Sequence, residues 1–276
     1  MITNSYATLQ EYIEFVTARG QSATSYANDD AVILSLLDKA SRDLESQTGR
    51  VFYPFVQTRY FDVPAGRELM VNADLLEVIS ASNGDGASIP STEYYLVPRN
   101  TSPAYSVKIT DVSAYYWTTN AQGSFENAVT ITGLWGYHDN YQREAWRLAT
   151  TTAEALDASE TEIDVSDANS LSVGQILKVD SELLYVTSIE SGKVKVQRGV
   201  NGSTAATHLT GVSVYYWRYM PGAVEAVLET AMAAYHRRFG KSLSNTETIT
   251  AAGVIVSPRD VPYSAASFIS IHRVRL

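Results

Sequence analysis

The sequence predicts an α+β protein with a helical core, extended β strands or hairpins, and a small inserted all-β domain. Three observations support this prediction. Apolar residues recur with a helical period in two segments of matching length, 29–48 and 221–240. Residues 51–132 contain short β-like runs separated by turn signals. Residues 150–217 contain evenly spaced short strands, one of which alternates strictly between polar and apolar side chains.

Three helices are expected, near residues 6–18, 29–48 and 221–240. Asn28 or Asp29 is a candidate N-cap for the second helix, and Gly49 is placed where a left-handed residue can end it. Pro221 suits the first position of the third helix, and Gly240 follows its last turn. Because both long helices have an apolar face, we expect them to pack against each other.

The central part of the chain reads as strand and loop. An aromatic strand is expected after Gly49, from Val51 to Asp62. The further candidate strands are Glu68–Asn72, Leu76–Ser80, Tyr94–Val97, Val107–Ile109 and Ala128–Thr132. Turn signals such as Asn83–Gly86 and Pro98 separate them.

Residues 150–217 are expected to form a separate β module. The segment Thr150–Glu154 has the composition of a linker, and Lys193–Arg198 alternates so that one face is buried. Turns at Asp180-Ser181 and Asn201-Gly202 fit tight hairpins. The predicted domains are therefore a discontinuous core, 1–149 plus 218–276, and a module at 150–217 inserted into it.

Composition excludes several classes of protein. The chain has 276 residues, 45% hydrophobic and 18% charged, with no cysteine, so disulfides and thiolate metal sites are excluded. The sequence contains no run of eighteen apolar residues, and its N-terminal segment does not have the pattern of a secretory signal. We therefore expect no membrane partner. The net charge of −9 argues against sequence-independent DNA binding by the body of the chain.

The C-terminal segment 241–276 differs from the rest in charge. Four basic residues and two acidic ones give it a net charge of +2, against −11 for residues 1–240. It also contains an apolar β-like run, Val254-Ile255-Val256, that ends at Pro258. Two readings fit: an edge strand on the core sheet, or an arm that binds a partner by strand addition. The opposite charge favours the arm.

No motif for catalysis or for cofactor binding is found. The four histidines lack the spacing of a metal site, and His138-Asp139 is read as a loop histidine beside a turn-forming aspartate. Asn83–Gly86 lacks the ligands of a calcium loop, and Asp29-Asp30 are explained by helix capping. We therefore expect no enzyme, no cofactor and no metal.

The string LLDKASRDLESQTGRVFYP, followed by TRYFD, resembles the head–tail connector (adaptor) proteins of long-tailed bacteriophages. Similar text recurs in order: EYYLVPRN at 93–100, GLWGYHDN at 133–140, the helix PGAVEAVLETAMAAYHRRFG and the final GVIVSPRDVP. The segment at 150–217 looks like a small β unit inserted in some of these connectors, whereas plain members of the family are much shorter.

The resemblance implies a structural virion protein at the head–tail interface, or neck, made in the host cytoplasm. Such proteins form a homo-oligomeric ring, typically of twelve subunits, that docks on the portal protein and extends the DNA channel. DNA passes through without specific binding, and the stopper or tail-completion protein assembles on the ring. An alternative reading is a binding module of a phage tail or capsid, in which the β insert contacts glycan or a decoration protein.

The C-terminal arm is then the expected portal-binding site. The residues assigned to it are Val254, Ile255, Val256, Pro258, Arg259, Phe268, Ile269, Ile271, Arg273, Arg275 and Leu276. The three arginines would meet acidic groups of the partner, and the large apolar residues of 268–276 would fill its pockets. We expect this segment to become ordered on binding, since ordering costs about 1–2 kcal/mol per residue of backbone entropy.

Overall fold

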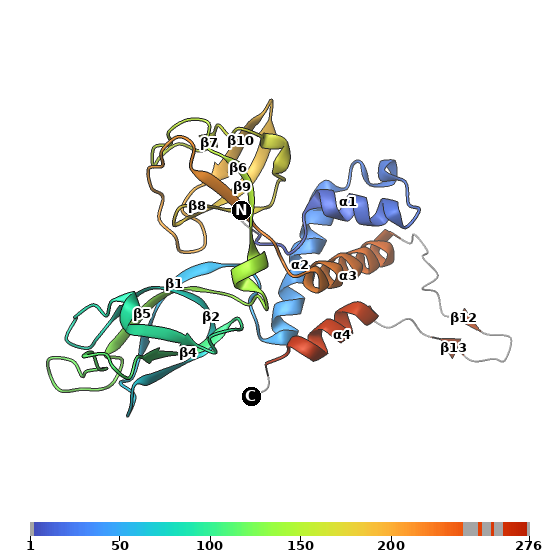
Figure 1. Ribbon diagram of the computed structural model, residues 1–276. Helices are drawn as coiled ribbons and strands as arrows, with labels where there is room; N and C mark the ends of the chain where they lie inside the picture. The colour runs from blue at the N-terminus through green and yellow to red at the C-terminus, as the bar shows by residue number, and fades with distance from the viewer. Residues whose placement is uncertain (1–2, 240–247, 250–254, 257–261, 275–276) are drawn as a thin grey trace.

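The computed structural model describes residues 3–239, 248–249, 255–256 and 262–274. These residues form three main parts: a five-stranded sheet, a six-stranded sheet and a cluster of helices (Figure 1). The two sheets lie one above the other on the left of Figure 1, and the helices lie on the right. A two-stranded hairpin, β12 (Thr248–Ile249) with β13 (Ile255–Val256), lies beyond the helices.

The helical cluster contains four α-helices. They are α1 (Leu9–Ala18), α2 (Asp30–Thr48), α3 (Pro221–Phe239) and α4 (Tyr263–His272). Thr8 and Glu11 form a capping box that begins α1, and Gly49 ends α2 with a left-handed φ of 72°. The side chain of Asp29 does not cap α2; it accepts a hydrogen bond of 2.5 Å from the hydroxyl of Tyr235 in α3.

The apolar faces of α2 and α3 meet as the sequence predicts. Ile33, Leu37 and Leu44 of α2 share one buried cluster with Val227 and Tyr235 of α3. Phe52, which follows α2, and Phe268 of α4 belong to the same cluster. The cluster therefore joins segments from both ends of the chain, and burial of its apolar area stabilises the association.

The five-stranded sheet is antiparallel and has the order β1-β5-β2-β4-β3. Its strands are β1 (Phe55–Phe61), β2 (Glu68–Ser82), β3 (Tyr94–Val97), β4 (Ala104–Ile109) and β5 (Val129–Trp135). Val129, Ile131 and Trp135 alternate along β5 and belong to one buried cluster with Leu75 of β2 and Val107 of β4. This sheet therefore has a core of its own.

The six-stranded sheet is also antiparallel, in the order β6-β11-β8-β9-β10-β7. Its strands are β6 (Trp146–Thr151), β7 (Glu162–Ile163), β8 (Ile176–Val179), β9 (Glu182–Glu190), β10 (Lys193–Gln197) and β11 (Ser213–Trp217). In β10, Val194 and Val196 are buried while Lys193 and Gln197 are exposed, which confirms the predicted alternation. Trp146 and Trp217 are paired, so the two ends of this part lie together.

The two sheets touch through a small apolar cluster. Leu76 and Leu134 of the five-stranded sheet pack with Ile176, Leu183 and Trp217 of the six-stranded sheet. A backbone hydrogen bond of 2.8 Å from the amide of Val56 to the carbonyl of Asn201 reinforces the contact. The inserted part is thus packed against the neighbouring sheet.

The prediction of an α+β fold built on a helical core is wrong. The fold is β-rich: two antiparallel sheets hold eleven strands, and the described residues are about 29% helical and 30% strand. The helices form one of three parts, because residues 55–135 pair over long sequence separations and bury their own core. Helical periodicity is visible locally in a sequence, whereas such pairing is not.

Several element boundaries differ from the predictions, and two of these differences change how the sheets are divided. The two candidates Glu68–Asn72 and Leu76–Ser80 are one bulged strand, β2. The segment Thr150–Glu154, read as a linker, begins inside β6, so the six-stranded sheet starts before residue 150. Whether the part at 150–217 folds autonomously stays a prediction.

Candidate functional site

The predicted portal-binding residues fall into three groups. Phe268, Ile269, Ile271 and Arg273 lie in α4 or directly after it. Ile255 and Val256 form β13, which pairs with β12 in antiparallel fashion. The predicted contacts Val254, Pro258, Arg259, Arg275 and Leu276 lie outside the described residues.

Two of these residues have a different role from the one expected. Phe268 is 7% exposed and belongs to the chain's own helical cluster, against which Ile269 also packs. Phe268 fills the core of this subunit rather than a pocket of a partner, and Ile269 is half-buried against that core. Their spacing with Ala265 and His272, three and four residues apart, is helical, and that signal was available in the sequence.

Arg50 anchors the end of α4 to the rest of the molecule. Its Nε donates a hydrogen bond of 2.7 Å to the carbonyl of His272, and its guanidinium lies 4.2 Å from the ring centre of Tyr137. The same guanidinium pairs with the carboxylate of Asp74 on β2. Burial raises the pKa of Asp74, and the charge of Arg50 acts against that rise. The junction therefore fixes helices and sheet in one geometry.

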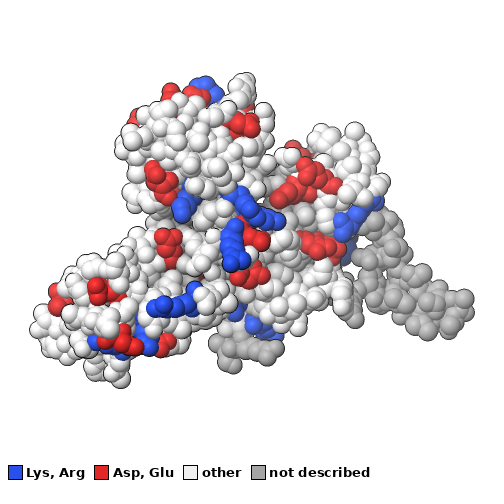
Figure 2. Space-filling view, in the orientation of Figure 1, with Lys and Arg blue, Asp and Glu red and all other residues white. Residues whose placement is uncertain are grey.

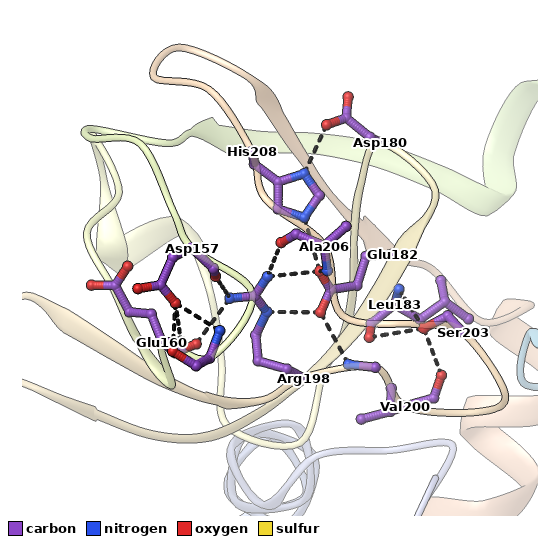
Figure 3. Close-up of polar contacts among 12 residues, drawn as sticks. Asp157, Glu160, Asp180, Glu182, Leu183, Arg198, Val200, Ser203, Ala206 and His208 are labelled. Atoms are coloured by element: carbon purple, nitrogen blue, oxygen red, sulfur yellow. Dashed lines mark hydrogen bonds and ion pairs between the residues drawn. The ribbon is translucent and has the colours of Figure 1, made fainter.

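A buried ionic network lies in the six-stranded sheet (Figure 3). Arg198 meets Glu182 with two parallel hydrogen bonds of 2.7 Å, from Nε to Oε1 and from Nη2 to Oε2. The backbone amides of Gly199 and Ala206 each donate to Glu182 at 3.0 Å. Glu182 is fully buried, so each of these bonds replaces one lost to water.

His208 extends this network toward the surface. Its Nε2 is 2.8 Å from Oε2 of Glu182, and its Nδ1 is 2.8 Å from Oδ2 of Asp180. Burial alone would raise the pKa of Glu182, but the hydrogen bonds from Arg198, His208 and the backbone lower it to about 2. The carboxylate is therefore ionised at neutral pH.

The network is suited to holding loops rather than to catalysis. Arg198 also donates to the carbonyls of Asp157, Glu160 and Ala206, at 2.8, 2.9 and 2.6 Å. Both carboxylate oxygens of Glu182 already accept from the protein, so neither is free to act as a base on a bound molecule. Sequence reasoning missed this cluster, because Glu182 and Arg198 come together only through the pairing of β9 with β10.

A cleft of about 590 Å³ lies between α1, α3 and the end of β11. Its charged side chains are largely engaged within the chain. Arg19 pairs with Glu229 at 3.2 Å and covers the ring of Phe15, while Glu11 completes the capping box of α1. On the face shown in Figure 2, acidic and basic side chains are interspersed over all three parts.

Among the described residues, the ring nitrogens of His138 contact the backbone of this chain. Its Nε2 is 3.1 Å from the carbonyl of Arg218, and its Nδ1 accepts from the amide of Asn140 at 3.0 Å. Burial lowers the pKa of this histidine. Within the described ranges, no group of three or more His, Cys, Asp or Glu residues is arranged to hold a metal ion.

Comparisons with known proteins identify no relative. No family model, no curated protein and no solved structure matches this chain. None of the helices in the described part of the chain is long and apolar enough to cross a membrane.

Proposed function

We propose that this chain is a structural virion protein of a long-tailed phage, a head–tail adaptor that forms a ring in the neck. In this role it docks on the portal protein, extends the DNA channel and provides the platform on which the stopper and tail attach. The chemistry required is surface recognition, not catalysis.

The observation that carries this proposal is the convergence of the segments that resemble the connector family. Helix α2 and the segment Arg50-Val51-Phe52 precede β1, whereas Tyr137 follows β5. The amide of Tyr137 nevertheless donates to the carbonyl of Val51 at 2.7 Å. The rings of Phe52 and Tyr137 are 5.6 Å apart, and those of Phe52 and Phe268 are 5.5 Å apart.

The backbone contact at position 136 explains why a glycine is required there. Gly136 has a φ of 135°, and a Cβ added there would lie 2.6 Å from the carbonyl oxygen of Tyr53. The missing side chain of Gly136 thus allows the backbones of GRVFYP and GLWGY, the two segments that resemble the connector family, to come into contact. These segments lie far apart in the sequence but pack into one unit with α3. Their packing supports treating them as the core that resembles the connector family.

The hairpin β12–β13 is compatible with the role of an attachment arm. It follows α3 and precedes α4, both of which are anchored in the helical cluster, and it lies beyond that cluster in Figure 1. A two-stranded element outside the body can add to the sheet of a neighbour through main-chain hydrogen bonds. Within the part of 241–276 that the structure describes, we therefore propose the paired strands β12 and β13 as the portal contact.

Mass photometry of the purified chain, alone and with the portal protein of the same phage, tests the proposal. We expect a discrete species whose mass is a fixed multiple of the subunit, at least when the portal is present. A monomer in both conditions, together with no ring of this chain in the assembled particle, would contradict the proposed function.

A further inference from the structure

The loop of residues 110–128 between β4 and β5 lies at the end of the five-stranded sheet far from the helices. Trp135, at one end of β5, pairs with Leu75 and Phe55 next to the helical cluster. Val129, at the other end, pairs with Phe61. The loop therefore leaves the sheet on the side opposite the helices, in the direction in which the sheet extends in Figure 1.

Hydrogen bonds from Arg67 and Trp117 hold this loop in a fixed conformation. The guanidinium of Arg67 donates to the carbonyls of Thr110, Ser113 and Tyr115, at 2.8, 3.1 and 3.1 Å. The indole of Trp117 is buried and donates to the carbonyl of Arg67 at 2.9 Å. A loop with this many internal bonds loses little further entropy when it binds.

The rigid loop presents large apolar side chains to solvent. Val112 is 95% exposed, and Tyr116 and Phe125 are 58% and 57% exposed. Its charged residues, Asp111 and Glu126, are both acidic. Glu126 makes no ion pair with any residue that the structure describes. Aromatic residues on a rigid support are typical anchors of protein interfaces.

A complementary surface lies on α4. Tyr263, Ser267 and Ile271 are spaced by four residues and form one exposed face, in which Tyr263 and Ile271 are 79% and 73% exposed. This face contains no charged residue, and Arg273 follows directly after the helix. Arg273 is exposed and forms no ion pair within the described ranges.

We propose that the loop 110–128 of one subunit docks on the α4 face of a second copy, with Glu126 near Arg273 of the neighbour. The inference rests on the proposed ring. Charge complementarity selects this occupant. Each apolar surface carries one charge with no ion pair among the described residues, a carboxylate on one surface and a guanidinium on the other, and these two charges attract each other. Because the two surfaces are different and lie on opposite parts of the molecule, the contact is head-to-tail and can close into a ring.

Charge reversal and its rescue test this pairing. Glu126→Arg and Arg273→Glu are compared with the double variant by sedimentation velocity, alone and with portal protein, over a concentration series. Each single variant should weaken self-association about tenfold or more, since like charges would face each other. The double variant should recover most of that loss because the pair is restored with reversed polarity.

Two matched controls separate a specific effect from a general one. Glu225→Arg changes the net charge equally at an exposed acidic residue on α3 and should leave assembly unchanged. Phe125→Ser should weaken assembly, whereas Leu209→Ser, at a 76% exposed leucine of the six-stranded part, should not. Circular dichroism of each variant checks that the fold is intact.

The outcomes distinguish this inference from the proposed function. If the unaltered chain forms no ring alone or on the portal, the adaptor proposal fails. If it forms a ring and the single reversals assemble normally, or the double variant shows no recovery, only the docking of the loop on α4 is overturned.

Discussion

The six-stranded sheet and the helical cluster differ in the sequence distance that their contacts span. In the sheet, the contacts among β6–β11 all lie within residues 146–217, whose two ends are paired. In the helical cluster, α2 packs with α3, and Arg50 bonds to the carbonyl of His272 near the other end of the chain. A change inside the six-stranded sheet, away from its contact with the five-stranded sheet, should therefore stay local, whereas a change in the cluster should affect both ends of the chain together.

The two regions also differ in what stabilises them. The sheet combines an apolar cluster with a buried ion pair, Glu182 with Arg198, and its hydrogen bonds. The helical cluster relies on aromatic and aliphatic packing, with contacts such as Phe52 against Phe268. Removal of one partner should be most costly where a charge would remain buried.

The largest effect is expected for Arg198→Ala. The fully buried carboxylate of Glu182 would lose its cation, which costs about 3–5 kcal/mol of unfolding free energy. Urea unfolding measures the loss, and hydrogen exchange should place it in residues 146–217 while protection of α2 and α3 is kept. As a control, Lys195→Ala removes an exposed pair with Glu190 and should cost less than about 1 kcal/mol. Equal costs would contradict the assigned role of burial.

A slightly smaller effect is expected for Phe268→Ala. Truncation of this side chain leaves a cavity in the helical cluster and should cost about 3 kcal/mol. Hydrogen exchange should increase in α2, α3 and α4 together, because all three share the cluster. The exposed neighbour Ile271→Ala provides the control and should have little effect on stability. Unchanged protection of α2 in Phe268→Ala would show that α4 is not part of this cluster.

Two glycines test the contact between the sheets. Gly202 and Gly192 both have a positive φ, of 81° and 83°, so alanine strains either backbone by about 1 kcal/mol. A Cβ at Gly202 would also lie 2.1 Å from the carbonyl oxygen of Val56, whereas nothing lies within 4 Å at Gly192. Gly202→Ala should therefore be the less stable variant in thermal unfolding. The same melting temperature for both would argue against close packing of the two sheets.

The sequence predicts local elements better than their assembly. The helices at 29–48 and 221–240 were predicted because their apolar residues recur with the helical period, and α2 and α3 confirm them. The β-rich fold was not predicted, since the pairing of β1 with β5 joins Phe55 to Trp135 across a long separation. Sheet order depends on such pairing, which no local pattern encodes.

The candidate sites show the same limit. The opposite charge of 241–276 predicts an arm over this whole segment, but α4 packs part of the segment into the core through Phe268. Glu182 and Arg198 carry no spacing signal, because only the fold brings them within 2.7 Å. The exposure of Phe125 and Tyr116 likewise depends on the support that Arg67 gives to the loop.

Electron cryomicroscopy of the chain assembled on its portal protein tests the central claim most directly. We expect a closed ring beneath the portal, with β12 and β13 toward the portal. We also expect the loop 110–128 of each subunit to lie against α4 of the next. A portal with no ring of this chain bound to it, under conditions where both proteins are folded, would contradict the account.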